Sequence, residues 1–567
     1  MHLRKAIVGS ILGFALSTTA RIIASDDVPL IGPSFISNFD PSTSRAIGNA
    51  KKAFPILLDK LFESGDLDRK DLAFTIDVYS AATNDTIFSY SHVGEKSKET
   101  ITSGELNDNT ISRTGSVTKL FTVYAIIAKA GMGVFSDPVT KYLPELENNS
   151  SGNPLDRVRW EDVTVGALAA HQAGSGGIAD FFNAYLDPEN PSEYKPEDLF
   201  TFFREKRLPV IAPYHSAIYS DGGFAILGQV LARLSGKSVT DSFEEILWKP
   251  LGMNNTSTQV PKGSNLNTID RTPVAHKSKL NETAWGQGIE IVASTGSIYS
   301  NTADLRKAGL SILNSELLSG PTISEWMKPR SATGTLVELV GAPWEISRLE
   351  IPVTPGSNRT RVSDLYTKAG GNIDYTAIFA LSPDQGIGYS ILIAGETATP
   401  ARWPLRNLVG ETFIPAAEHA MAENAARNLA GTFVDEKNSG NNVTLSVDRG
   451  HPGLGLKSFW LKGKNARDSS HYRLYPTGLN SVSKSLSSLY RSEGTMRIAH
   501  RMVKPGVKPV EPRAAVEGGK GGLFDDSFVW MALDQEGPVD LFVFTLVDGK
   551  VTTVEYPLTG VVMKRVK

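Results

Sequence analysis

Hydrophobic positions recur with two different spacings along the chain. Helical spacing marks residues 41–66, 116–129, 161–171, 222–235 and 302–314. Short apolar runs bounded by turn-forming residues predict strands over 72–79, 86–90, 364–369, 375–381 and 387–394. Strands at both ends of a helical middle indicate a mixed sheet flanked by helices.

The pattern changes after residue 430. An Ala-rich helical stretch over 415–429 ends at Ala430-Gly431. Beyond it, short strand-like runs alternate with Gly, Asn, Asp and Pro, at 443–447, 528–533, 540–546 and 551–556. We therefore expect an α/β (α+β) domain over residues 41–415, followed by a small all-β domain over 428–567 that is lipocalin-like in pattern. A chain of 567 residues is long enough for two domains.

The helix expected over 116–129 begins with a Ser-x-x-Lys pattern. This spacing places the Ser116 hydroxyl and the Lys119 amine on one helix face, where a buried neutral amine can accept the hydroxyl proton. The positive end of the helix dipole and the Ser116 backbone N–H would favour a developing oxyanion.

The Ser-x-x-Lys pattern alone is weak. It also occurs at Ser192 to Lys195 and at Ser481 to Lys484, but neither of those opens a long buried helix. The alternative interpretation of Ser116 is a helix N-cap, with Lys119 extending its amine to solvent.

Two further segments carry candidate chemistry. Tyr219 lies in a loop before the helix at 222–235, and a tyrosine placed between two cations can act as a general base. Lys368-Ala369-Gly370-Gly371 ends a predicted strand, where small residues allow a substrate to approach and the Gly371 N–H could serve as a second oxyanion donor.

These three segments, in this order, resemble the Ser-x-x-Lys, Tyr-x-Asn and Lys-Thr-Gly motifs of the serine β-lactamase and penicillin-binding-protein-like family. The family includes class C β-lactamases, D-alanyl-D-alanine carboxypeptidases and related esterases. Connecting segments at 163–174, 250–256 and 296–305 are also similar, so the resemblance covers about residues 45–400. It implies the β-lactamase/transpeptidase-like fold, an antiparallel sheet flanked by helices plus a helical lobe, with the active site between them.

The resemblance also implies roles for single residues. Ser116 would be the nucleophile and, with Gly371, an oxyanion donor, and Lys119 would activate it. Tyr219 would act as general base and acid. Lys368 would be the cation that steers Tyr219 and binds a substrate carboxylate.

Two positions depart from the family pattern. Asp221 stands where Asn is usual, so a hydrogen-bond donor to a substrate amide becomes a carboxylate that could instead pair with Lys119. Ala369 replaces Thr and removes a hydroxyl that helps to bind a substrate carboxylate. Both changes weaken the case for β-lactam or peptidoglycan substrates. Gly370 and Trp344 complete the expected substrate-binding set, and core packing is the alternative for Trp344.

Composition narrows the remaining chemistry. The chain contains no cysteine, which excludes thiol nucleophiles, zinc-thiolate sites and disulfides. A net charge of -3 gives no support for a nucleic-acid partner. No ligand cluster with metal spacing is evident, and we expect neither a metal nor an organic cofactor. The expected partner is a small-molecule or short peptide substrate.

The N-terminus predicts a secreted protein. Arg4 and Lys5 precede an apolar run over 6–16 and the small residues Ala20 and Ala24, a signal-peptide layout over residues 1–24 that is too short for a membrane span. Eight glycosylation sequons favour a eukaryotic secretory route. They begin at Asn84, Asn148, Asn149, Asn254, Asn255, Asn281, Asn358 and Asn442.

The leading hypothesis is a secreted serine hydrolase that cleaves an ester or amide through an acyl-enzyme at Ser116. An acyltransferase or a tailoring hydrolase of fungal secondary metabolism is the first alternative, because some fungal relatives use the same residues that way. A catalytically silent binding protein on the same fold is the second, motivated by Asp221 and Ala369.

Overall fold

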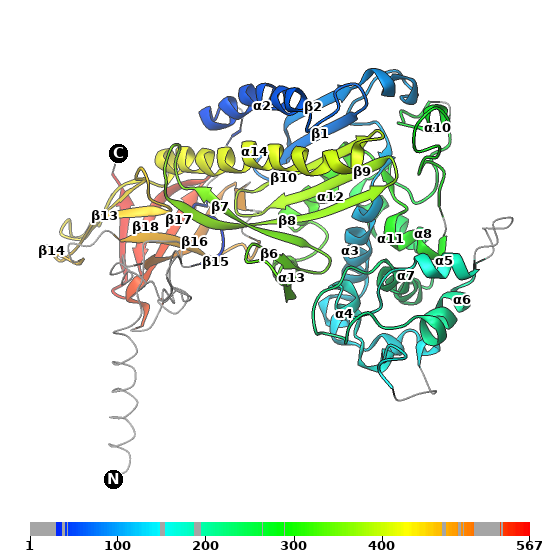
Figure 1. Ribbon diagram of the computed structural model, residues 1–567. Helices are drawn as coiled ribbons and strands as arrows, with labels where there is room; N and C mark the ends of the chain where they lie inside the picture. Colours follow the sequence, from blue (N-terminus) through cyan, green and yellow to red (C-terminus); the bar gives the residue numbers. More distant parts are fainter. Residues whose placement is uncertain are drawn as a thin grey trace, which may run out of the picture. The chain divides into compact units, whose positions relative to one another are not determined.

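The computed structural model contains two compact units (Figure 1). The larger unit, called the catalytic unit because it contains the three candidate motifs, comprises residues 40–349 and 364–417, and the C-terminal unit comprises residues 350–363 and 418–567 with the described residues before 40. The structure describes residues 30–36, 40–41, 43–147, 153–185, 194–263, 265–288, 290–467, 472–485, 489–490, 493–503, 533 and 537–566.

An eight-stranded sheet forms the centre of the catalytic unit, in the order β2-β1-β10-β9-β8-β7-β6-β5. Every residue of β1, β9 and β10 is buried, which explains why these strands read as continuous apolar runs. The strands are β1 (Ala73–Ser80), β2 (Asp85–Val93), β5 (Ser331–Ala332), β6 (Glu338–Val340), β7 (Glu345–Pro352), β8 (Thr360–Asn372), β9 (Tyr375–Ser382) and β10 (Ile387–Ala394). A separate pair, β3 (Ser112–Arg113) and β4 (Tyr299–Ser300), lies beside the candidate site.

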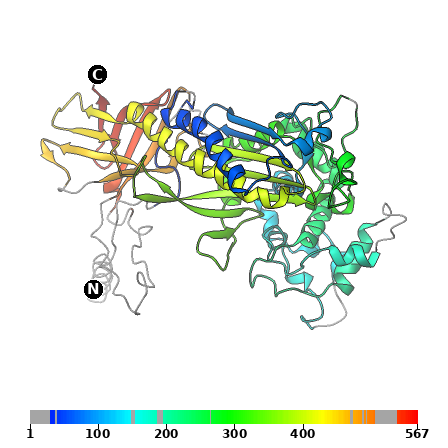
Figure 2. The same ribbon diagram turned by 45° about the horizontal axis from the view of Figure 1, so that its top comes forward.

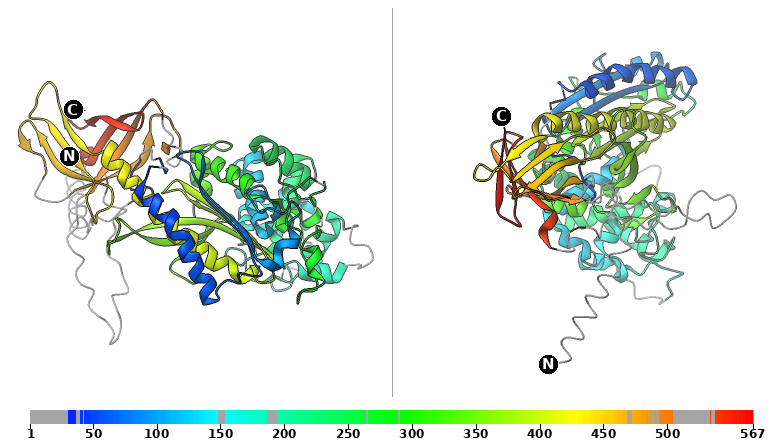
Figure 3. Two further views of the ribbon diagram at one scale, coloured as in Figure 1. Left: turned by 90° about the horizontal axis from the view of Figure 1, so that it is seen from above. Right: turned by 90° about the vertical axis from the view of Figure 1, so that its left-hand side faces the viewer.

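Helices cover both faces of this sheet. On one face α2 (Arg45–Ser64) and α14 (Ala398–Asn428) run side by side, as Figures 2 and 3 show, with Phe54 and Phe413 in ring contact at 5.9 Å. On the other face Asp77 of β1 bonds to Arg306 of α12 (Thr302–Asn314). Because successive side chains of a strand point to opposite faces of the sheet, β1 can contact the helices on both faces.

A helical lobe carries the candidate site. Its central helix, α3 (Thr118–Ala130), is buried over its first ten residues and packs against α7 (Asp221–Ser235) and α11 (Ala293–Gly296). Ser220 caps α7 by accepting a hydrogen bond from the Gly223 N–H at 2.8 Å. The remaining α-helices are α4 (Val165–Ala169), α5 (Ala179–Tyr185), α6 (Pro196–Thr201), α8 (Val239–Phe243), α9 (Lys249–Leu251), α10 (Thr272–Ala275) and α13 (Gly320–Trp326).

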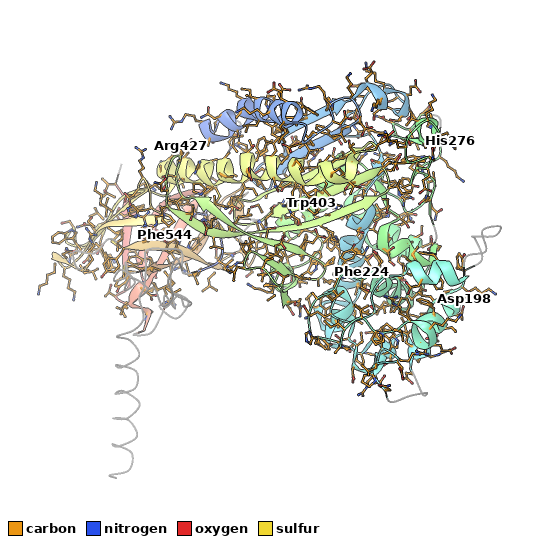
Figure 4. The ribbon with its side chains drawn as sticks, in the orientation of Figure 1. Asp198, Phe224, His276, Trp403, Arg427 and Phe544 are labelled. Atoms are coloured by element: carbon orange, nitrogen blue, oxygen red, sulfur yellow. The ribbon has the colours of Figure 1, made fainter. Side chains whose placement is uncertain are left out.

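The C-terminal unit is a closed barrel of antiparallel strands. The strand order is β12-β11-β19-β18-β17-β16-β15-β13-β14, and an additional pairing of β12 with β13 closes the sheet on itself. Alternate residues fill the interior, among them Phe544, labelled in Figure 4. Its strands are β11 (Gly431–Val434), β12 (Asn442–Ser446), β13 (Leu454–Leu461), β14 (Lys464–Asn465), β15 (Arg473–Asn480), β16 (Thr495–Val503), β17 (Leu541–Val547), β18 (Lys550–Tyr556) and β19 (Val561–Arg565).

The observed architecture confirms the expected fold class, and some elements differ in extent. The helix expected over 415–429 begins at Ala398 and contains Pro404 and Pro415 in its interior. The helix expected over 161–171 shortens to α4, because residues 160–162 form a 3-10 turn and Thr164 caps the helix that follows. The signal peptide over 1–24 and nearly all of the strand expected over 528–533 lie outside the described residues.

Candidate active site

Ser116 lies in a 3-10 turn, η2 (Gly115–Val117), that leads directly into α3. This turn touches β8 so closely that only glycine fits on either side. A Cβ on Gly370 would overlap the carbonyl oxygen of Thr114, and one on Gly115 would lie 2.5 Å from the Gly371 nitrogen. The two expected oxyanion donors, the N–H groups of Ser116 and Gly371, therefore belong to segments in direct contact.

Lys119 is held in place by three polar partners. Its Nζ lies 3.0 Å from Ser116 Oγ, 2.7 Å from the Thr295 carbonyl oxygen and 2.6 Å from Asp221 Oδ1. The Lys119 side chain is 0% exposed, whereas that of Asp221 is 43% exposed. Asp221 thus pairs with Lys119, as the sequence suggested for a carboxylate at this position. The snorkelling alternative for Lys119 does not hold, because its amine is fully buried.

Tyr219 lies between the two lysines. Its ring centroid is 5.0 Å from Lys119 Nζ and 5.2 Å from Lys368 Nζ, and the residue is 47% exposed. The His171 ring stacks on Tyr219 at 4.6 Å, and its Nδ1 accepts the Ser220 N–H. Burial, with the nearby lysine charges, places the pKa of His171 well below its usual value. His171 is therefore uncharged, and its ring packs against the ring of Tyr219.

Lys368 of β8 bonds to Glu345 of β7 and to the Ala369 carbonyl oxygen. The same glutamate accepts the Ala369 N–H at 2.8 Å. Burial disfavours the charge of Lys368, which is 1% exposed, but the surrounding groups, Glu345 first among them and then Tyr219 and Asp221, together outweigh burial and raise the pKa of Lys368. Lys368 is a permanent cation behind Tyr219, held by a carboxylate from the neighbouring strand.

Several contributors were not singled out in the sequence. Glu345 directly follows Trp344, yet its partner is 23 residues away on β8. The Thr295 carbonyl comes from α11, and Arg402 of α14 donates to the Gly370 carbonyl oxygen at 3.0 Å. No local motif marks a backbone carbonyl or an acid whose partner lies on the neighbouring strand.

Trp344 is a core residue. It is fully buried, lies 5.2 Å from the Trp326 ring and meets Tyr366 edge to face. The core-packing alternative fits this environment, and the expected contact of Trp344 with substrate does not. The other three expected substrate-binding residues, Asp221, Ala369 and Gly370, adjoin the Ser116 turn or its lysines.

The sequons are distributed over the surface of both units. Asn84, Asn254, Asn281 and Asn358 are exposed, while Asn255 and Asn442 are partly buried. Asn148 and Asn149 lie outside the described residues. Their glycosylation remains a prediction.

Membrane-spanning helices and metal-binding clusters can be assessed for the described residues. Within them, no helix is long and apolar enough to cross a bilayer. The same residues contain no group of three His, Asp or Glu side chains arranged to hold a metal ion.

A cavity of about 250 Å³ adjoins α11, lined by residues that include Ala293, Ser297 and Gln259.

Sequence comparison assigns the chain to a class of hydrolases whose members include serine enzymes. A profile described as Beta-lactamase matches residues 82–410, more than half of the chain. The protein belongs to the beta-lactamase family. A second profile, described as Beta-lactamase-like-like, C-terminal domain, matches residues 421–567. The resemblance inferred from the motifs is thereby confirmed.

Three relatives show the breadth of the family. The chain is 27% identical over 561 residues to a Beta-lactamase-like protein of Arthroderma benhamiae, covering 88% of this chain and 89% of that protein. It is 22% identical to Probable hydrolase M10 of a Phoma species, covering 71% and 69% of the two chains. It is 24% identical to the D-alanyl-D-alanine-carboxypeptidase/endopeptidase AmpH of Escherichia coli, covering 51% and 72%.

Proposed function

We propose that this protein is a secreted serine hydrolase that cleaves an ester or amide through an acyl-enzyme at Ser116. One observation carries the proposal: the Ser116 hydroxyl lies 3.0 Å from the Nζ of a lysine that is entirely buried. A buried amine at this distance can take the hydroxyl proton directly. The half-exposed Tyr219 ring leaves the site open to a substrate.

The reaction follows from this geometry. Ser116 Oγ attacks the substrate carbonyl carbon while its proton passes to neutral Lys119 Nζ. The carbonyl oxygen becomes an oxyanion that faces the N–H groups of Ser116 and Gly371. The bond to the leaving group then breaks, and Tyr219 supplies the proton that the leaving group needs and regains one from Lys119. Water repeats these steps on the acyl-enzyme and releases the acid.

Secretion forms part of the proposal. It rests on the signal-peptide layout over residues 1–24 and on exposed sequons such as Asn84 and Asn281. Recovery of the protein from the culture medium of a fungal host, with a mass that falls on endoglycosidase treatment, is the expected result. Retention of the unglycosylated protein in the cells would contradict it.

A fluorophosphonate probe tests the acyl-enzyme step. We expect one adduct on the peptide that contains Ser116, lost in Ser116→Ala. Ser481→Ala is the matched control, because Ser481 and Lys484 form the same Ser-x-x-Lys pattern in the C-terminal unit. No adduct on the folded protein, or turnover of p-nitrophenyl esters that survives Ser116→Ala, would favour the binding-protein alternative instead.

Acyl transfer is a second candidate for the same site. The half-exposed carboxylate of Asp221 can accept a hydrogen bond from the hydroxyl or amine of an acyl acceptor. Turnover of p-nitrophenyl butyrate with and without added alcohols and amines distinguishes the two reactions. A new ester or amide product in place of butyric acid would identify a transferase, including one that tailors a fungal metabolite.

A further inference from the structure

The Lys119 nitrogen has three partners, and two of them can only accept hydrogen bonds. These are the Thr295 carbonyl oxygen at 2.7 Å and the Asp221 carboxylate at 2.6 Å. The third, the Ser116 hydroxyl, can accept or donate. The two acceptor-only groups therefore take two N–H bonds, and the remaining position on the nitrogen is directed at Ser116 whether it holds a proton or a lone pair.

We propose that Asp221 is a positioning residue that, with Ser116 and Lys119, forms a three-member proton-transfer set. This inference rests on the proposed acyl-enzyme function. Asp221 orients the Lys119 lone pair, and its negative charge stabilises the ammonium that forms when Ser116 loses its proton. The buried aspartate of a Ser-His-Asp triad acts on its histidine in the same way.

The groups of the site and the substrate supply and accept every proton and electron pair in this step. As the bond from Ser116 Oγ to the acyl carbon forms, the Oγ–H bond breaks and its proton joins the Lys119 lone pair. The carbonyl electrons move to the oxygen and return when the leaving group departs with a proton. Asp221 neither gains nor loses a proton in this step, so it changes the energy of the charged lysine without itself reacting.

The other charges near Lys119 do not replace this carboxylate. Lys368 of β8 lies across the Tyr219 ring and is neutralised by Glu345 of β7. His171 stacks on Tyr219, and burial keeps it neutral. The remaining neighbours of Lys119 are uncharged: the Thr295 carbonyl of α11 and, on α7, the Phe224 ring labelled in Figure 4, 5.7 Å from the amine. Among the described residues, Asp221 is the carboxylate at salt-bridge distance from Lys119.

A negative charge at this place has a consequence that a neutral amide would not have. Relative to a neutral side chain, a carboxylate at this distance stabilises the ammonium form of the amine over the neutral form. Asp221→Asn keeps the shape of the side chain and removes the charge. The amine should then become reactive at lower pH, while the ammonium formed during attack is less well stabilised.

The test is the pH dependence of fluorophosphonate labelling, followed by intact-protein mass spectrometry between about pH 6 and 10. The proteins compared are the full-length wild type, Asp221→Asn, Asp221→Glu and a control, Asp59→Asn on α2, which removes an exposed ion pair with Arg69. In Asp221→Asn we expect the midpoint of the labelling profile to fall by about one pH unit or more. Its limiting rate should fall about 10- to 100-fold, the worth of a hydrogen bond to a charged group.

The controls separate this role from a merely structural one. Asp221→Glu retains the charge, so its midpoint should stay with that of the wild type even if its rate is lower. The labelling profile of Asp59→Asn should coincide with that of the wild type. Equal midpoints in the wild type and Asp221→Asn, with circular dichroism showing both folded, would overturn the inference. A wild type that is never labelled at Ser116 would instead refute the proposed function.

Discussion

Lys368 carries its charge inside the catalytic unit, and Glu345 is the group that makes this tolerable. An ammonium buried without a partner is costly, because water no longer solvates it. Together with the Lys119–Asp221 pair, this gives the site two buried lysines, each paired with a half-exposed carboxylate. The carboxylates lie on the solvent side and the lysines lie behind them.

Glu345→Gln should therefore destabilise the protein in a pH-dependent way. At neutral pH we expect a loss of about 3 kcal/mol in the free energy of unfolding, since Lys368 keeps a buried charge without its partner. Burial lowers the pKa of Lys368, but Glu345 together with Tyr219 and Asp221 outweighs burial and raises it, so the stabilisation by Glu345 is complete below the usual lysine value and disappears as pH rises through the raised pKa. The deficit should shrink toward alkaline pH.

Urea unfolding at a series of pH values, from neutrality to above the usual lysine pKa of about 10.4, measures this difference. Glu338→Gln, at an exposed position on the neighbouring strand β6, serves as the control. A deficit that stays constant across this range would show that Glu345 acts by packing and not by charge.

At the scale of single residues, the sequence predicted the reacting groups better than the residues that hold those groups in place. Ser116, Lys119, Tyr219 and Lys368 are brought together as the motifs implied. Glu345 was not singled out, because its role depends on how β7 lies beside β8, and strand neighbours are not encoded locally. Trp344 was placed in the substrate-binding set, although a large apolar ring satisfies the core equally well.

The contact between the Ser116 turn and β8 is the decisive feature at the level of elements. Gly370→Ala should push the strand away, because the new Cβ would overlap the Thr114 carbonyl oxygen and lie 2.8 Å from the Ser116 nitrogen. Displacement of reacting groups by about 1 Å costs about 100-fold in rate. We expect a loss of this size in fluorophosphonate labelling, with little change in far-ultraviolet circular dichroism.

The adjacent residue provides the matched comparison. A Cβ on Gly371 would meet only the end of the Arg402 side chain, at 3.2 Å, and that side chain can move. Gly371→Ala should therefore label much faster than Gly370→Ala. Similar losses in the two variants would mean that the β8 backbone itself, and not its close approach to Ser116, limits the reaction.

Element types were predictable from periodicity, and their ends were less so. The apolar strands at 375–381 and 387–394 lie within one residue of β9 and β10. The long helix α14 was shortened in the sequence interpretation, because Pro404 and Pro415 read as a boundary and tertiary packing overrides that signal. Strand β8 begins four residues before the expected position 364, where its polar residues gave no pattern.

Among the described residues, each unit of the molecule buries one neutral histidine, His171 in the catalytic unit and His500 in the barrel. Burial lowers the pKa of His500 to about 3, and it stacks on Phe544 at 4.1 Å. The unfolded chain takes up a proton below about pH 6.5, whereas the folded barrel does not. Stability should therefore fall as pH drops from this value toward 3.

His500→Leu should remove this part of the acid sensitivity. Between about pH 6.5 and 5, the wild type should lose about 1.4 kcal/mol per pH unit more than the variant, the value for one linked proton. Urea unfolding at these two pH values measures the slope. His276→Gln, at the exposed position labelled in Figure 4, should leave it unchanged, and a His500→Leu slope equal to that of the wild type would contradict the linkage.

The pairing of β1 with β10 sets a requirement on the synthesis of this chain. Ala73 pairs with Ala394, so more than 300 residues must leave the ribosome before the inner edge of β1 finds its neighbour. Until then the β1–β2 hairpin presents an open strand edge whose residues are all buried in the finished sheet, the kind of surface to which other nascent chains add. Chaperone engagement early in translation, and slow refolding from denaturant, are the expected costs of a sheet whose centre is completed last.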